Sequence, residues 1–299
     1  MNRYALYTGC NPKMAEPELL KSVHAVAVHM GIQLIELDKV SCCGGAHLQD
    51  KNPFQALLLN ARNFTFAERL QLDMVTICNT CQYVLSEAHH RLTHDPHVRT
   101  QINQRLNTQK RRFQGTSRPR NLLYVLMEDI GRSSIRRHVV RPLTGLKVAP
   151  FYGCHLYSPT SIQKEYTSQE SPWNPSSLEH LIADLGAEAV PFPQQNQCCG
   201  FHSSLYQSKT SAALVESIFS DAEAHEADII ITPCPLCHAN LEAFIGRHRI
   251  PVLYYQQLMG LAYDLSWKEL GLQHNMSVRK RALLKMLPAV PARLRTELR

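Results

Sequence analysis

The chain has 299 residues, 44% of them hydrophobic, and a formal net charge of +7 at pH 7. This is enough apolar material for the core of one large or two ordinary domains. No stretch approaches the ~18 to 20 uninterrupted apolar residues of a membrane-spanning helix, and no apolar run of signal-peptide length opens the chain, so we expect a cytoplasmic protein.

The ten cysteines form two copies of one spacing pattern, with none left over. Each copy has a lone cysteine, a Cys-Cys-Gly triplet, 34 further residues after the second cysteine of the pair, and a Cys-x-x-Cys. In a reducing compartment this indicates metal or redox chemistry rather than disulfides. Thiolates select zinc, copper(I) or iron–sulfur clusters, and five are one more than a tetrahedral zinc site or a cubane cluster uses. The first set is Cys10, Cys42, Cys43, Cys78 and Cys81, and the second is Cys154, Cys198, Cys199, Cys234 and Cys237.

The first half of the chain predicts alternating helices and strands. Pro17 begins a helix that Gly31 ends, and a strand over 32–37 leads to the first triplet. The remaining expected elements are a helix over 53–70, a buried strand over 73–77 that runs into Cys78, and a last strand over 122–126.

The second half repeats this order, as a duplicated unit predicts. Ser176 or Ser177 caps a helix that Gly186 ends. The further expected elements are a strand over 187–192, a helix over 210–224, and strands over 228–232 and 252–255.

These elements predict an α/β fold of two pseudo-twofold-related lobes, each a small, mostly parallel sheet with flanking helices. Each Cys-x-x-Cys follows the carboxyl end of a strand and precedes a helix, where α/β sheets bind ligands and where the helix amino terminus favours thiolate. We place the first domain at 1–147, the second at 148–275, and a basic amphipathic tail at 276–299.

The double motif resembles the cysteine-rich, or CCG, domain proteins, in particular the B-type subunit of heterodisulfide reductase and its bacterial relatives. The resemblance implies that each complete set of five cysteines holds a noncubane 4Fe-4S cluster, and that the two clusters face one cavity. Some relatives bind zinc in one lobe, so zinc stays possible here. The departure is a longer gap in the second copy, over 158–175, which reads as a surface loop able to cover the cavity. The segments that carry the resemblance are Tyr7-Thr8-Gly9-Cys10, Cys42-Cys43-Gly44, Cys78-Asn79-Thr80-Cys81, Tyr152-Gly153-Cys154-His155, Cys198-Cys199-Gly200 and Thr232-Pro233-Cys234-Pro235-Leu236-Cys237.

The resemblance implies an oxidoreductase subunit that acts only within a complex. One hypothesis is thiol/disulfide chemistry on a sulfur carrier in a heterodisulfide-reductase-like complex. Another is the CCG subunit of a non-classical succinate dehydrogenase or fumarate reductase that passes electrons to quinone, and a third is a structural zinc protein. Since no cysteine is left for a ferredoxin-type cluster and no dinucleotide fingerprint is present, electrons come from partners: a ferredoxin-like (C-type) iron–sulfur subunit and a flavoprotein.

Four histidines stand beside the motifs: His47, His155, His202 and His238. A neutral imidazole can ligate zinc, donate a hydrogen bond to a sulfide, or deliver a proton to a departing thiolate. His155 and His202 are the first candidates for a catalytic role because they stand next to expected ligands on the cavity side.

Two basic segments account for the positive charge. Residues 91–120 contain eight Lys or Arg against one acidic residue, but lack aromatic interleaving, so we expect a solvated insertion or a protein-docking surface and no nucleic acid. In the tail, Leu283 and its apolar neighbours share a helical face flanked by cations. This suits peripheral contact with the inner face of a membrane or with an acidic partner, the alternative being a frayed terminal helix. The apolar positions are Val278, Ala282, Leu283, Met286 and Leu287, and the cations are Arg279, Lys280, Arg281 and Lys285.

Overall fold

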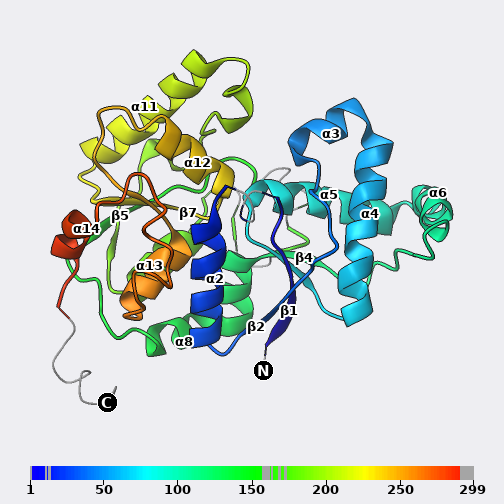
Figure 1. The fold of residues 1–299 in the computed structure, drawn as a ribbon, viewed down its shortest axis with the longest axis horizontal. Coiled ribbons are helices and arrows are strands. Elements are labelled where there is room, and N and C mark those ends of the chain that lie inside the picture. Colours follow the sequence, from blue (N-terminus) through cyan, green and yellow to red (C-terminus); the bar gives the residue numbers. More distant parts are fainter. Residues whose placement is uncertain are drawn as a thin grey trace.

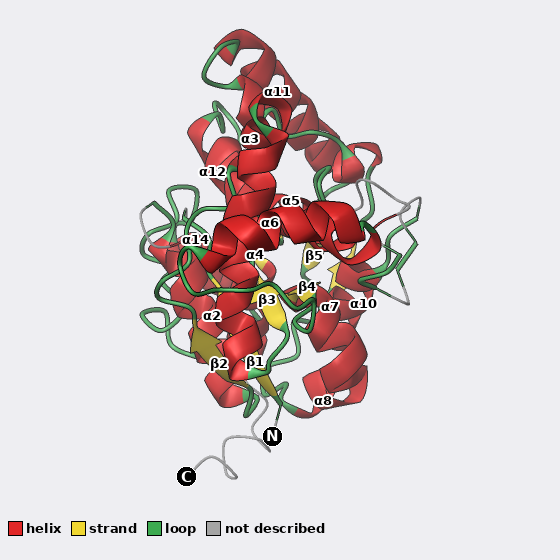
Figure 2. Cartoon of the chain, turned by 90° about the vertical axis from the view of Figure 1, so that its right-hand side faces the viewer, coloured by secondary structure: helices red, strands yellow, loops and turns green. Residues whose placement is uncertain are grey.

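A computed structural model of the chain describes residues 2–10, 12, 15–156, 162, 164–167, 170–171 and 174–289. Within them the chain forms two four-stranded sheets whose strands are all parallel, and helices flank both sheets (Figures 1 and 2). The predicted α/β fold with one sheet in each half is therefore confirmed. Figure 1 shows α3 to α6 of the first half on the right and α11 to α14 of the second half on the left, with α2 of the first half beside α13.

The first sheet has the strand order β2-β1-β3-β4. Helix α4 begins at Pro53, where Asn52 accepts a hydrogen bond from the backbone N–H of Gln55, and it ends at Leu70, as the sequence predicts. The strands are β1 (Arg3–Tyr7), β2 (Gln33–Glu36), β3 (Met74–Thr76) and β4 (Pro119–Asn121), and the helices are α2 (Pro17–His29), α3 (Gly45–Lys51), α4 (Pro53–Leu70), α5 (Asn79–His94) and α6 (Pro96–Asn107).

The predicted strand over 122–126 is wrong, because these residues are helical. Strand β4 ends at Asn121, whose side chain accepts a hydrogen bond from the backbone N–H of Leu123 and caps the helix that follows. A short apolar run has no periodicity that distinguishes a buried strand from a buried helix. The Asn121 cap therefore determines that a helix begins here. The helical connection consists of α7 (Leu122–Tyr124), the π-helical η1 (Val125–Gly131) and α8 (Arg132–Arg137).

The second sheet has the order β6-β5-β7-β8, which corresponds strand by strand to the first. Strand β6 is only two residues long, shorter than the predicted 187–192. At the start of α10, the Glu170 carboxylate accepts hydrogen bonds from the backbone N–H groups of Ser176 and Ser177, in place of the predicted serine cap. The strands are β5 (Lys147–Pro150), β6 (Glu188–Ala189), β7 (Ile229–Thr232) and β8 (Val252–Tyr254), and the helices are α10 (Ser177–Asp184), η2 (Pro193–Asn196), η3 (Phe201–Ser203), α11 (Ser208–Ala224), α12 (Pro235–Ala243), α13 (Tyr255–Ala262) and α14 (Lys280–Met286).

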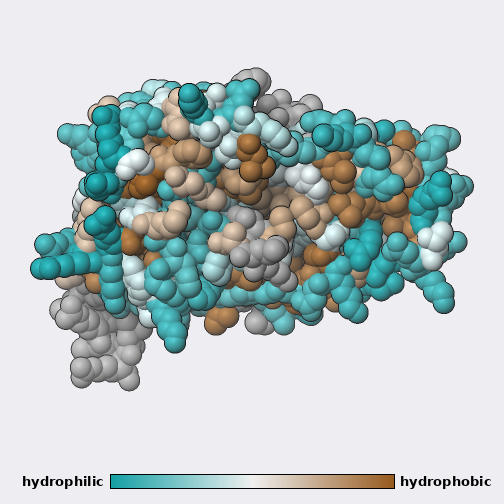
Figure 3. All heavy atoms as spheres, turned by 45° about the horizontal axis from the view of Figure 1, so that its top comes forward, coloured by the Kyte–Doolittle hydropathy of each residue, from teal (hydrophilic) through white to brown (hydrophobic). Residues whose placement is uncertain are grey.

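The two halves share their hydrophobic packing. Helix α2 of the first half lies against α13 of the second, as Figure 1 shows, and one buried cluster contains Leu6 of β1 together with Val148 of β5 and Leu253 of β8. Burial of apolar surface therefore fixes the two sheets relative to each other. In Figure 3, hydrophobic side chains reach the surface in patches along the middle of the face, with hydrophilic ones above and below.

The described part of the tail packs on the protein. Leu283 of α14 is 1% exposed, and Val278 and Leu287 pack against the same core. The amphipathic face predicted for a membrane or a partner groove thus packs largely on the protein, and Met286 of that face is 39% exposed. Within the described residues, none of the helices combines the length and the apolar character needed to cross a bilayer.

Candidate metal centre

Each Cys-x-x-Cys joins a strand to a helix, as predicted. Cys78 follows β3 and occupies the N-cap position of α5, and Cys234 follows β7 and occupies the N-cap position of α12. The unpaired backbone N–H groups and the dipole at a helix amino terminus stabilise a thiolate there. Of the ten cysteines, those of both Cys-x-x-Cys motifs and the second of each pair are buried.

The glycine of each triplet is required by backbone geometry. Gly44 and Gly200 have φ angles of +95° and +85°, which side-chain-bearing residues rarely adopt. A Cβ atom on Gly44 would lie 2.8 Å from Cβ of Leu48, and one on Gly200 would lie 2.9 Å from Oγ of Ser211. In this turn the N–H of Gly44 donates to Sγ of Cys42 at 3.4 Å, and that of Gly200 to Sγ of the corresponding cysteine at 3.3 Å.

Two glycines whose role the sequence did not reveal stand just before the lone cysteines. A Cβ atom on Gly9 would lie 3.2 Å from Sγ of Cys81, and one on Gly153 would lie 2.9 Å from Sγ of Cys237. Both have positive φ angles, +73° and +70°. They let the backbone beside each lone cysteine approach the last sulfur of its set. The recurrence of Gly-Cys in both halves was the signal that could have identified them.

In each half a buried asparagine bonds to the second cysteine of the pair, from a helix that differs between the halves. Nδ2 of Asn60 on α4 donates to the carbonyl oxygen of Cys43 at 3.0 Å, and Nδ2 of Asn240 on α12 donates to that of Cys199 at 2.5 Å. Both amides are buried, so these bonds hold the pair against the neighbouring helix. No motif in the sequence points to either asparagine.

Two thiols of the first set are close enough to bind one metal ion. Sγ of Cys43 lies 3.6 Å from Sγ of Cys81. Two thiolates on one tetrahedral ion, with metal–sulfur bonds near 2.3 Å, are about 3.8 Å apart, so this spacing fits. Hydrogen-bonding contacts link further members of each set, and one contact crosses between the sets, from Cys78 to Cys234.

Hydrogen bonds among the thiols separate their pKa values. The thiols of Cys10 and Cys43 lower the pKa of Cys42 to about 2, because they donate to its thiolate. The same contact raises the pKa of Cys43 to about 12. In the second set, hydrogen bonding to Cys154 lowers the pKa of Cys198 to about 6. Sulfurs this close cannot all be anionic unless a cation balances their charge.

Among the described residues that line the second set, none supplies such a cation. A cavity of about 20 Å³, the volume of roughly one water, adjoins it. No lysine or arginine of the described residues lines this cavity. The chemistry of the donor set therefore suits a metal ion or an iron–sulfur cluster, whose positive iron centres would balance the thiolates, and a cluster would need the cysteines to move apart. The lining residues are Asn79, Thr80, Cys154, His155, Cys198, Cys199, Phe201, His202, Cys234, Leu236 and Cys237.

The structure brings His155 and His202 together at this cavity. Nδ1 of His155 lies 2.9 Å from Oγ1 of Thr80, and Tyr83 stacks on the His155 ring. The ring centres of the two histidines are 5.2 Å apart, and Nδ1 of His202 lies 3.3 Å from Nε2 of the exposed His47. Burial lowers the pKa values of His155 and His202, so both are held as neutral imidazoles.

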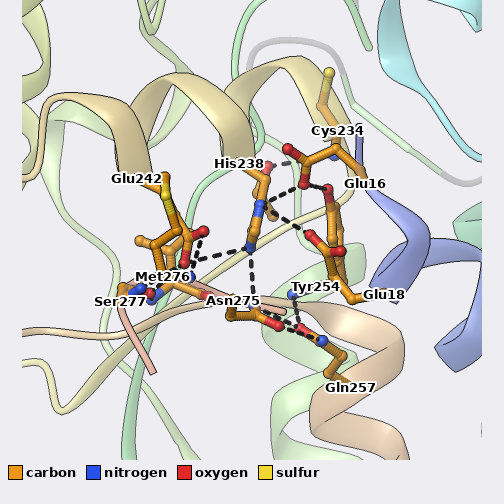
Figure 4. Close-up of polar contacts among 12 residues, drawn as sticks. Glu16, Glu18, Cys234, His238, Glu242, Tyr254, Gln257, Asn275, Met276 and Ser277 are labelled. Carbon is orange, nitrogen blue, oxygen red and sulfur yellow. Dashed lines mark hydrogen bonds and ion pairs between the residues drawn. The ribbon is translucent and has the colours of Figure 1, made fainter. Parts of the chain in front are cut away.

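His238 points away from the cysteines, into a buried network (Figure 4). Its Nδ1 lies 2.8 Å from Oε2 of Glu16, which also accepts a hydrogen bond from the hydroxyl of Tyr254 at 2.6 Å. Its Nε2 lies 2.9 Å from Nδ2 of Asn275. Glu16 belongs to the first half and the other residues to the second, so this network connects the halves next to Cys234.

The described part of the long gap crosses to the first half. The hydroxyl of Tyr166 lies 2.9 Å from Nδ1 of His89 on α5, and the guanidinium of Arg118 donates to the carbonyl oxygen of Glu165. Much of the loop predicted over 158–175 lies outside the described residues. The prediction that this loop covers the cavity therefore falls on residues that the structure does not describe.

Comparison with known families identifies the repeated unit. The model of the cysteine-rich domain family, CCG, matches residues 4–86 and 148–242, and these two segments contain both sets of cysteines. The chain belongs to the CCG cysteine-rich domain family. The resemblance recognised from the cysteine motifs is thereby confirmed.

Relatives that match this CCG protein over most of its length include proteins named as reductase subunits. It is 38% identical over 282 residues to the 8-methylmenaquinol:fumarate reductase membrane anchor subunit of Wolinella succinogenes, covering 91% of this chain and 96% of that one. It is 30% identical to a protein of Archaeoglobus profundus that is named as similar to the B-type subunit of heterodisulfide reductase (87% and 90%). It is also 30% identical to the B-type subunit of the ferredoxin:CoB-CoM heterodisulfide reductase of Methanosarcina mazei (92% and 94%).

A solved structure supports the fold alone. The crystal structure of a hypothetical protein from Helicobacter pylori superposes with a TM-score of 0.73 at 14% identity, covering 93% of this chain and 52% of that one.

Proposed function

We propose that each set of five cysteines holds a noncubane 4Fe-4S cluster and that the chain is an electron-transfer subunit of a multi-subunit reductase. The observation that carries this proposal is that matching glycine turns gather five cysteines in each half, with Sγ of Cys43 3.6 Å from Sγ of Cys81 in the first set. Clusters held there would supply one-electron donors and acceptors. The chain itself contributes the burial of six of the ten thiols and the glycine turns that gather them.

Sequence similarity favours a quinol-linked complex. The menaquinol:fumarate reductase subunit is 38% identical to this CCG protein, against 30% for each of the two heterodisulfide reductase relatives over similar shares of the chain. We therefore place the fumarate reductase hypothesis before the sulfur-carrier hypothesis, which reverses their order from the sequence. In such a complex the chain passes electrons between a membrane quinol and a flavoprotein, directly or through a ferredoxin-like subunit.

The histidines at the second set keep thiol/disulfide chemistry as a second candidate function. A departing thiolate needs a proton, and His155 and His202 border the same cavity as Cys234. Through His47 they reach the exposed surface of α3. Such a row of imidazoles would relay protons whether the acceptor is a sulfur compound or a quinone, so it does not separate the two hypotheses.

We expect any contact with a membrane to depend on the positive charges around α14 rather than on its apolar face. The apolar side of α14 is largely used for packing, but Arg279, Lys280, Arg281 and Lys285 flank it, and each is worth about 1 kcal/mol near an anionic bilayer. We expect the full chain to sediment with anionic vesicles at low salt and to release at high salt. A variant with these four residues changed to Gln tests the charge without removing Leu283, as deletion of 276–299 would.

The assignment of the complex is tested in the host cell. A tagged chain purified anaerobically is expected to carry with it a flavoprotein and an iron–sulfur subunit, and to couple oxidation of a soluble menaquinol analogue to fumarate reduction. Cys78→Ser should lower this coupled rate while fumarate reduction by an artificial donor to the flavoprotein persists. A complex that reduces a heterodisulfide but not fumarate would overturn the quinol assignment and establish the second candidate.

A further inference from the structure

A second cluster of metal-ligating side chains lies outside the cysteine sets, at the far end of α5. His90 and His94 are four residues apart on this helix and therefore project from the same face. Glu165, from the second half of the chain, meets them there, and one ligand atom from each of the three residues lies within 4.8 Å of the others. We propose that His90, His94 and Glu165 form a binding site for a divalent transition metal ion such as Zn²⁺ or Ni²⁺.

The contact distances suit a shared ion. Nδ1 of His90 lies 2.9 Å from Oε1 of Glu165. Two ligands of one tetrahedral ion, with bonds near 2.1 Å, are about 3.4 Å apart, so a small outward movement of the exposed Glu165 side chain admits the ion. Nδ1 of His90 is itself buried and makes no aligned hydrogen bond within the described part of the chain.

One ring nitrogen of His94 contacts the backbone, and the other is available to bind a metal ion. Nδ1 of His94 lies 2.9 Å from the carbonyl oxygen of His90, which leaves Nε2 as its donor atom. The two imidazole rings stack with their centres 4.2 Å apart, and one nitrogen of each lies within 4.8 Å of the other. Two imidazoles and one carboxylate are a donor set for zinc, nickel or cobalt, with the remaining positions open to water.

Neighbouring contacts hold Glu165 in place. The carbonyl oxygen of Glu165 accepts a hydrogen bond from the guanidinium of Arg118, and the adjacent Tyr166 contacts His89 on the same helix as the two histidines. The ion would thus fasten the crossing segment, residues 164–167, to α5. Cys81 is nine residues before His90 on that helix, about 14 Å along its axis, so this site is separate from the cysteine sets.

Nickel binding by the cluster-loaded protein tests the proposal. Isothermal titration with Ni²⁺ under anaerobic conditions is expected to show one equivalent bound, without the near-ultraviolet charge-transfer bands of nickel thiolates. His94→Ala and Glu165→Gln should each weaken this binding by at least about tenfold, since removing even an indirect support of a ligand costs that much. His97→Ala, which changes an exposed histidine on the neighbouring α6, is the matched control and should bind as the wild type does.

Trypsin cleavage after the exposed Lys164 provides a second measurement. If cleavage requires the crossing segment to detach, Ni²⁺ at ten times its dissociation constant should slow it about tenfold in the wild type and in His97→Ala, but not in His94→Ala. Iron content must be equal in all proteins compared. Unchanged nickel affinity in both ligand variants, or no nickel bound by the wild type, would overturn the site, and binding without protection would overturn the fastening of the segment.

Discussion

Cys78 and Cys234, which follow corresponding strands of two different sheets, interact with each other across the two halves. Around them, Nδ2 of Asn79 donates to the carbonyl oxygen of Tyr152 at 2.8 Å, and Thr80 contacts His155. The two residues between the cysteines of the first Cys-x-x-Cys therefore bond across to the second half. These contacts place the first Cys-x-x-Cys directly against the second half of the chain.

Metal content is the first prediction. Protein purified without oxygen is expected to contain roughly eight iron and eight acid-labile sulfide per chain, because two four-iron clusters require them. Elemental analysis and sulfide assay measure this. About half that iron together with one zinc would confine the redox chemistry to one set, and zinc alone, without visible charge-transfer absorption, would exclude a redox role.

Serine in place of a paired cysteine should act locally. Cys42→Ser is expected to lose or convert the cluster of the first set, and Cys199→Ser that of the second, because a neutral hydroxyl replaces a thiolate donor. Iron assay and electron paramagnetic resonance, with each variant as control for the other, should show that the remaining set keeps most of its iron. Wild-type iron and spectra in either variant would contradict the five-ligand assignment.

Gly153→Ala should disturb the second set specifically. Its Cβ would press on Sγ of Cys237 at 2.9 Å, so we expect loss of iron from that set. Gly145→Ala is the matched control, because Gly145 also has a positive φ angle but nothing lies within 4 Å of its added Cβ. Both changes cost about 1 to 2 kcal/mol of backbone strain. Equal iron contents in the two variants would show that the close approach does not matter.

Leu283→Ala should destabilise the protein although it lies in the tail. Its side chain is 1% exposed, so a cavity would cost roughly 2 to 5 kcal/mol in the free energy of unfolding. Leu284→Ala, at a position 47% exposed, should cost much less. Urea denaturation of the cluster-loaded proteins compares them, and similar midpoints for the two variants would argue against packing of α14.

The pH dependence of stability should contain a contribution from Glu18. Burial, followed by its hydrogen bond with Glu16, raises the pKa of Glu18 to about 8. In the unfolded state the pKa of this carboxyl is about 4.3, so the folded state binds the proton more tightly than the unfolded state does. The resulting contribution to the free energy of unfolding decreases as the pH rises toward 8. Facing charged groups are Glu16 and His238, which remain in the variant.

Glu18→Gln has the size of the protonated Glu18 side chain and carries no charge. The free energy of unfolding, measured by urea denaturation, should therefore fall less steeply between pH 6 and 8 in this variant than in the wild type. The exposed Glu188→Gln serves as the control. A variant that loses stability with pH as steeply as the wild type would rule out this contribution.

The spacing of the cysteines, read along the chain, was sufficient for the family and for the assignment of each cysteine to a set. The bounds of α4 and the placing of Cys78 and Cys234 at strand-to-helix junctions also followed from local signals: proline and asparagine at a helix start, and short β-branched runs before a cysteine. Such features depend on neighbours within one or two turns of the chain, so they can be predicted without the fold.

Tertiary structure alone decided which groups meet across the halves. His155 and His238 both stand next to a cysteine in sequence, yet one borders the cavity and the other turns into a network with Glu16. The apolar face of α14 predicted equally well a membrane contact or a packed helix, and only the position of Leu283 against the core distinguishes them. Hydrophobic periodicity tells which face of an element is apolar but not what covers it, because that depends on segments distant in the chain.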